Sequence, residues 1–178
     1  MKSVESEMLD EKTDMYIRLY CQGTVALTCE WILGKYKASP EELGKELIMS
    51  VAIRYYSRSG NTKEVAEAIA KAAGVSAVSV DAGDAKLSQP VDVLFVGGAL
   101  YAYGIDSHLK DYLKTLNKND AKKAVVFSTS WISKHSIDLI KKGLEEAGIT
   151  VVEESFYVKS KPSEEQLKEA ADFARKYI

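Results

Sequence analysis

One short stretch of the sequence has the residue types and the position to bind an anion. Its members are Ser57, Arg58, Ser59, Gly60, Asn61 and Thr62. An apolar run typical of a strand precedes it, and a segment with the apolar spacing of a helix follows it. The N-terminus of a helix presents unpaired backbone N–H groups and the positive end of the helix dipole, and here hydroxyl and amide side chains lie beside it. Gly60 allows the backbone to come close to a ligand. The stretch therefore predicts a phosphate-binding turn.

The same residues exclude two other kinds of phosphate loop. No lysine follows the glycine, so the turn is not the cradle of a P-loop nucleotide-binding protein, and it lacks the second and third glycines of a dinucleotide fingerprint. A hydroxyl-rich site for a monophosphate remains. The alternative is an ordinary connection between a strand and a helix, because serine, glycine, asparagine and threonine are common in turns.

The pattern S/T-x-S/T-G-N-T directly after a first strand resembles the phosphate loop of flavodoxins and flavodoxin-like proteins, which bind FMN. The resemblance covers residues 49–178. It implies FMN as the cofactor and residues 57–62 as the site of its phosphate. Residues 1–48 lie outside this likeness, so the chain is divided into a helical extension, 1–48, and an FMN-binding domain, 49–178.

Strand and helix patterns alternate from Met49 onward, which predicts a parallel sheet with helices on both faces. Strands are expected at 51–56, 77–80, 91–96, 124–127 and 150–158. Four helices are expected. The first covers 62–73, the second begins at a cap at Ser107, the third ends before Gly148, and the fourth begins at a capping box of Ser163 with Gln166. The fold class is α/β, a doubly wound five-stranded parallel sheet, and it fits the flavodoxin-like strand order 2-1-3-4-5.

In such a sheet, ligands bind at the carboxyl ends of the strands where the strand order reverses. The two loops that follow strands three and four are therefore candidates for the rest of the site. They contain Ala99, Leu100, Tyr101, Ala102, Tyr103 and Gly104, and Thr129, Ser130, Trp131 and Ile132. In flavodoxin-like proteins the loops at these positions hold the flavin ring.

Three aromatic residues of these loops are candidates to stack on a flat ring. Tyr103 or Tyr101, together with Trp131, would supply the stacking surfaces, each adding about 0.5–1.5 kcal/mol beyond area burial. The alternative is that they fill core space beneath the loops. Gly98 and Gly104 would allow the backbone to approach the polar edge of the ring.

Composition and motifs exclude several classes of protein. The net charge of −2 argues against a nucleic-acid surface, and the chain has neither an apolar run of membrane-spanning length nor an N-terminal secretory signal. We therefore expect a cytoplasmic protein that binds neither nucleic acid nor membrane. Two cysteines, Cys21 and Cys29, are too few for a disulfide framework or a metal site. A nucleophile elbow, an HExxH motif and a CxxC motif are all missing from the sequence.

The charge differs between the two parts of the chain. Residues 1–48 contain 6 Lys/Arg and 9 Asp/Glu, a net charge of −3, which leaves 18 Lys/Arg and 17 Asp/Glu, or +1, for residues 49–178. Soluble flavodoxins that carry electrons are typically strongly acidic, so this chain departs from the pattern. His108 and His135 flank the ring loops and could donate a proton, although such histidines are more often polar loop residues.

The extension, residues 1–48, has the pattern of two helices. The first, from about Glu11 to Leu33, is apolar over much of its circumference, and the second begins at Ser39 with proline at its first position. Residues 8–48 weakly resemble the C-terminal helices of tetracycline-repressor-type regulators, which form the dimer interface in that family. The helix-turn-helix that reads DNA is missing, so DNA binding is not implied. A homodimer formed through these helices is expected.

Two functions remain open. The preferred one is an FMN-binding redox protein that transfers electrons through the flavin to a protein partner or to a small acceptor such as a quinone. The alternative is a non-enzymatic sensor or assembly module with the same fold, attached to regulator-derived helices.

Overall fold

We describe a computed structural model of the chain, covering residues 49–102, 104–131 and 133–178. The helices expected in residues 1–48 lie outside this part, as do Tyr103 and Ile132.

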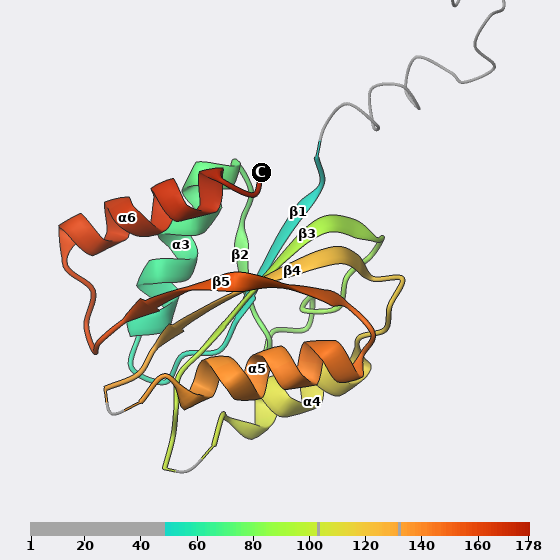
Figure 1. Ribbon diagram of the computed structural model, residues 1–178, viewed down its shortest axis with the longest axis horizontal. Helices are drawn as coiled ribbons and strands as arrows, with labels where there is room; N and C mark the ends of the chain where they lie inside the picture. The colour runs from blue at the N-terminus through green and yellow to red at the C-terminus, as the bar shows by residue number, and fades with distance from the viewer. Residues whose placement is uncertain (1–48, 103, 132) are drawn as a thin grey trace, which may run out of the picture. The chain divides into compact units, whose positions relative to one another are not determined.

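Five parallel strands form one sheet in the order β2-β1-β3-β4-β5, which confirms the predicted fold (Figure 1). The strands are β1 (Val51–Tyr55), β2 (Ala77–Ser79), β3 (Val91–Gly98), β4 (Ala121–Thr129) and β5 (Thr150–Val158). The helices are α3 (Asn61–Ala73), α4 (Ser107–Thr115), α5 (His135–Glu146) and α6 (Glu164–Arg175). Figure 1 shows α3 and α6 on one face of the sheet and α4 and α5 on the other.

Each face of the sheet has its own apolar core, and β3 supplies both. Val93 and Phe95 pack with residues of α3 and α6, while Leu94 and Val96 pack with residues of α4 and α5. All four side chains are completely buried. Successive side chains of a strand point to opposite faces, so a central strand covered on both sides must be apolar throughout. This is the physical reason that β3 is apolar throughout its central part, with Asp92 near the amino end as the exception.

Two strands are longer than their apolar runs predict. β4 extends from Ala121 to Thr129, beyond the expected 124–127, and β3 continues through Gly98. Both strands are paired on each side, and the pairing of Gly98 with Ser128 continues the ladder where the side chains are no longer apolar. Backbone hydrogen bonds, which the apolar pattern does not report, therefore set the strand ends.

One of the two predicted helix caps is confirmed and the other is wrong. Ser163 and Gln166 form the expected capping box of α6. Ser107, predicted to cap α4, is the first residue of that helix, and the cap is Asp106, whose side chain accepts a hydrogen bond from the backbone N–H of His108. Aspartate and serine are about equally good caps, so adjacent Asp106 and Ser107 left the choice to the tertiary environment.

At the amino ends of β1 and β3, Asp92 gives the fold a defined response to acid. Its carboxylate accepts hydrogen bonds from the Ser50 backbone N–H and hydroxyl, both at 2.8 Å, and lies 2.6 Å from the Lys122 ammonium. The hydrogen bonds of Lys122 and Ser50 lower the pKa of Asp92 to about 2. A carboxyl whose pKa is lower in the folded state stabilises the fold above its unfolded pKa of about 3.9 and loses that stabilisation as the pH falls through 2.

We therefore predict that Asp92→Asn flattens the acid limb of the stability curve. Between pH 4.5 and pH 2 the free energy of unfolding of the variant should fall less than that of the original chain, because asparagine does not titrate. Urea denaturation at a series of pH values measures this. Parallel curves for the two proteins would show that Asp92 does not carry the effect.

Candidate functional site

The turn between β1 and α3 has the backbone geometry of an open anion site. Gly60 caps α3 with φ of 90°, and no side chain in the described ranges forms a capping hydrogen bond with this helix. The Ser57 hydroxyl accepts a hydrogen bond from the backbone N–H of Gly60 at 3.1 Å, which fixes the conformation of the turn. The positive φ requires glycine, because other residues rarely adopt that conformation. The first N–H groups of α3 are therefore left for a ligand.

The side chains of the turn divide into an exposed group and a buried one. Ser59 is exposed, and its hydroxyl has no hydrogen-bond partner within the described part of the chain. Thr62 is 1% exposed, and its hydroxyl lies 2.7 Å from that of Thr129 at the end of β4. Thr62 thus connects the turn between β1 and α3 to the end of β4, 67 residues away.

Further contacts join this turn to the loop after β3, and that loop to the loop after β4. The Tyr101 hydroxyl accepts a hydrogen bond from the Arg58 backbone N–H at 3.1 Å, and the Arg58 guanidinium lies 4.2 Å from the centre of the Tyr101 ring. The Leu100 backbone N–H donates to the Ser130 hydroxyl at 2.7 Å. The sequence predicted that these three segments would meet, and the structure brings them into direct contact.

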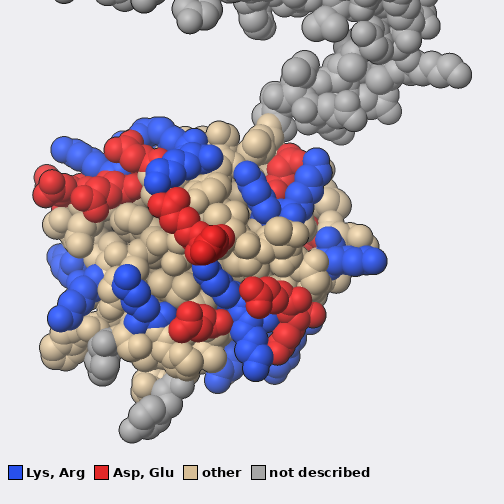
Figure 2. Space-filling view, in the orientation of Figure 1, with Lys and Arg blue, Asp and Glu red and all other residues tan. Residues whose placement is uncertain are grey.

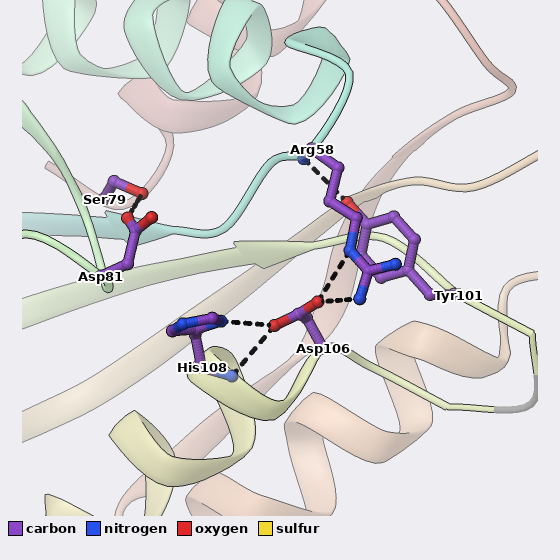
Figure 3. Close-up of polar contacts among 6 residues, drawn as sticks. All are labelled: Arg58, Ser79, Asp81, Tyr101, Asp106 and His108. Carbon is purple, nitrogen blue, oxygen red and sulfur yellow. Dashed lines mark hydrogen bonds and ion pairs between the residues drawn. The ribbon is translucent and has the colours of Figure 1, made fainter.

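Asp106 is the central polar residue of this site, although the sequence reading missed it. Figure 3 shows its two carboxylate oxygens facing different partners. One accepts hydrogen bonds from the Arg58 guanidinium, including Nε at 2.8 Å, and the other accepts from the backbone N–H of His108 and lies 2.9 Å from its Nδ1. Asp106 is only 4% exposed. A buried carboxylate needs such partners, because an unpaired one would be costly.

The pKa of Asp106 follows from these contacts. Burial raises the pKa of the carboxyl, and the hydrogen bonds from His108 and Arg58 lower it further than burial raises it, so the pKa lies below its usual value. Asp106 is therefore ionised at neutral pH and holds Arg58 by its charge. The same interaction places the guanidinium over the Tyr101 ring.

A stacked pair of rings continues the site. The centres of the Tyr56 and His108 rings lie 5.1 Å apart, with 12° between the ring planes, and the Tyr101 ring lies 6.5 Å from Tyr56 at 79°. Tyr56 directly follows β1 and was not among the predicted site residues. A tyrosine that ends an apolar strand beside a polar turn is a signal that could have identified it. His135, in contrast, is exposed, and its Nδ1 lies 3.6 Å from Asp138.

The structure distinguishes two of the three aromatic residues predicted to stack on a ring. Tyr101 is half-buried and its ring is covered by Arg58, whereas Trp131 is 73% exposed. Trp131 therefore presents a free aromatic surface, whereas the Tyr101 ring is only partly free. Tyr103 and Ile132 lie outside the described residues.

The loop after β3 is a tight turn. Tyr101 and Gly104 exchange two backbone hydrogen bonds, at 2.7 and 3.1 Å, and Ala102 between them has φ of 53°. Non-glycine residues with positive φ are uncommon and often occur at functional sites. Gly98, predicted to allow close approach to a ligand, is the last residue of β3, where a Cβ atom would be 2.4 Å from the Leu109 side chain. Its role is to let α4 pack closely.

Beneath the loop after β4 lies a cluster of three buried serine hydroxyls. Ser136 lies 2.7 Å from Ser128 and 3.0 Å from Ser130, and all three side chains are at most 1% exposed. The Tyr157 hydroxyl also donates to the backbone oxygen of Ser130. These contacts fix the backbone that leads to Trp131. Ser128 and Ser136 were not predicted, because buried serines have no distinguishing sequence pattern.

Comparison with known proteins identifies the family. The sequence profile of the flavodoxin domain matches residues 52–169, which is more than half of the chain. The chain belongs to the flavodoxin domain family. No curated protein sequence matches it.

Solved flavodoxin structures share the fold at low sequence identity. A flavodoxin from the domain Archaea is 23% identical, with a TM-score of 0.64 over 72% of this chain and 96% of that one. Flavodoxin 2 from Bacillus cereus is 21% identical, with a TM-score of 0.62 over 72% and 97%. Rubredoxin oxygen:oxidoreductase from Desulfovibrio gigas is 18% identical, with a TM-score of 0.64 over 71% of this chain and 34% of that enzyme. At these identities the likeness shows the fold.

The described ranges lack two other features, a metal site and a membrane-spanning helix. They contain no group of three or more His, Cys, Asp or Glu side chains placed to hold a metal ion. None of the helices described there is both long and apolar enough to cross a membrane.

Proposed function

We propose that this flavodoxin-family chain binds FMN and transfers electrons through it to a protein partner or a small acceptor such as a quinone. The observation that carries the proposal is the uncapped N-terminus of α3, with Gly60 at φ of 90° and the hydroxyl-rich turn beside it, at the point where the strand order reverses. In this assignment residues 57–62 bind the phosphate.

The donors of the turn fit a phosphate group. Backbone N–H groups at a helix N-terminus favour an anion, and the free Ser59 hydroxyl adds a further donor. The Arg58 guanidinium is held by Asp106, so the turn offers mainly neutral donors. Such a donor set suits a monophosphate.

For the flavin ring we assign the two loops that contact the turn, residues 99–104 and 129–132. Trp131 supplies an exposed aromatic face, and Tyr101 supplies a second surface whose position is fixed by Arg58. Tyr103 and Ile132 keep the roles predicted from the sequence. When bound, the flavin supplies the redox chemistry, while these residues orient it and shield it from water.

A direct test is to titrate the purified protein with FMN and to follow the quenching of flavin fluorescence, with riboflavin as the comparator. We expect tight binding of FMN and weaker binding of riboflavin, because riboflavin lacks the phosphate. Anaerobic reduction with dithionite, followed by addition of quinone and protein acceptors, then tests electron transfer. Protein that quenches neither flavin would favour the alternative of a non-enzymatic module with this fold.

The remaining parts of the proposal rest on the sequence. We propose a cytoplasmic protein in which residues 49–178 form the functional domain and residues 1–48 act as a dimerisation element. Light scattering of the full chain beside a version that begins at Met49 tests the dimer. We expect twice the monomer mass only for the full chain, and equal monomeric masses would remove the dimer from the proposal.

A further inference from the structure

The loops that follow β4 and β5 carry positive charge without any acidic residue. Residues 130–134 and 159–163 contain Lys134, Lys159 and Lys161 and no aspartate or glutamate. All three lysines are exposed. We call these three residues the lysine rim.

The two loops lie side by side at the edge of the sheet that carries the proposed flavin site. Thr129 pairs with Val158 at the last position of the ladder between β4 and β5, so Trp131 and Lys159 follow two adjacent strand ends. The Lys134 ammonium lies 5.3 Å from the centre of the Tyr157 ring, which places this N-cap residue of α5 against the end of β5. The lysine rim is therefore next to the loop that contains Trp131.

The rim is held in place by its backbone. The Tyr157 hydroxyl donates to the backbone oxygen of Ser130, which joins the end of β5 to the loop after β4. Between Lys159 and Lys161, Ser160 has φ of 67°, and Pro162 after them is buried. A non-glycine residue with positive φ costs free energy and persists only where the surrounding structure holds it. The positions of the two lysines are thus set by the fold of the loop.

Ion pairs balance some of the lysines of this domain but none of the rim lysines described. Lys114, Lys142 and Lys176 each have a carboxylate within 4 Å, whereas none of the rim lysines forms an ion pair within the residues described. Figure 2 shows basic and acidic side chains interspersed over the helices of the face in view. The nearest acids along the chain are Asp138 in the first turn of α5, which lies 3.6 Å from His135, and Glu164 and Glu165 in the first turn of α6. In both helices these acids interact favourably with the helix dipole.

We propose that the lysine rim is the docking surface for an acidic electron-transfer protein, which would approach the proposed flavin beside Trp131. This inference rests on the proposed function and names the partner class. Charges at the rim of an interface raise the rate of association and select partners of complementary charge. A protein partner is proposed over a small anion because the three lysines are exposed and come from two separate segments of the chain.

The test compares two variants with the same net charge. One neutralises the rim, Lys134→Gln/Lys159→Gln/Lys161→Gln, and the matched control is Lys114→Gln/Lys118→Gln/Lys142→Gln on α4, α5 and the turn before β4. The probe is an acidic plant-type [2Fe–2S] ferredoxin, with a basic cytochrome c as the comparator of opposite charge. Association rates are measured by stopped flow at several salt concentrations, and amide chemical shifts locate the contact.

We expect the rim variant to associate with the ferredoxin about tenfold more slowly at low salt and to lose most of its salt dependence. The control should stay within about twofold of the original chain. Equal losses in both variants would overturn the proposal. So would faster association of the original chain with the cytochrome than with the ferredoxin. So would a sulfonated quinone that binds through the rim while the ferredoxin does not bind. FMN affinity is measured on the same samples, so a failure of the proposed function would appear separately.

Discussion

Replacing Ser59 by aspartate is expected to weaken FMN binding by about thirtyfold and to leave riboflavin binding unchanged, a loss of about 2 kcal/mol. Ser59 is exposed, directly precedes the Gly60 cap and has no hydrogen-bond partner among the described residues. A carboxylate at this position would repel the phosphate across a few ångströms. Only FMN carries the phosphate, so the ratio of the FMN and riboflavin affinities measures the contribution of the turn to phosphate binding.

The same substitution should not damage the fold, which makes the result easy to interpret. An acidic residue at the N-terminus of a helix stabilises it by about 0.3–1 kcal/mol, so the variant should unfold at the same or a higher urea concentration. Ser88→Asp is the matched control, because Ser88 is an exposed residue in the loop before the amino end of β3. If Ser88→Asp weakened FMN binding as strongly, net charge would explain the effect. If Ser59→Asp weakened both flavins equally, the phosphate would be bound elsewhere.

Ser59 is a better position for this test than Thr62, although both belong to the predicted phosphate turn. The Thr62 hydroxyl is buried against Thr129, so its removal would also disturb the contact between the turn and β4. A buried hydroxyl left without its partner costs about 1–3 kcal/mol. Loss of FMN binding in a Thr62 variant would therefore mix two causes.

Gly97→Ala is expected to cause the largest loss of stability, about 3 kcal/mol in the free energy of unfolding. A Cβ atom at Gly97 would lie 2.1 Å from two carbons of the Phe127 ring. Phe127 belongs to β4, and its side chain is completely buried in the core beneath α3 and α6. Its ring therefore cannot move without disturbing that core. Chemical denaturation of the two proteins measures the difference.

Two further variants make this prediction specific. Gly83→Ala is the control, because a Cβ atom there would meet no atom within 4 Å, and we expect its stability to change by no more than about 0.5 kcal/mol. Phe127→Leu combined with Gly97→Ala should be more stable than the sum of the single changes predicts, since the shorter side chain leaves space. Strict additivity would show that the two residues do not compete for the same volume.

The sequence alone determined the elements of this fold and their order. Apolar periodicity located the four described helices, and the nearly continuous apolar run of β3 identified a central strand. The alternation of strand and helix predicted the parallel sheet, and the polar turn at residues 57–62 lies at the first helix, as expected. These features are visible in sequence because they depend on neighbours three or four residues away, or on burial on both faces.

The tertiary structure alone decided which side chains meet. Asp106 caps α4 in place of Ser107 because its carboxylate also holds Arg58, a residue 48 positions earlier in the chain. Thr62 reaches Thr129 in the same way, across 67 positions. Such contacts depend on how two distant loops approach in space, and periodicity carries no information about that distance. The sequence therefore predicted a phosphate-binding turn, and only the fold determined which residues hold that turn in shape.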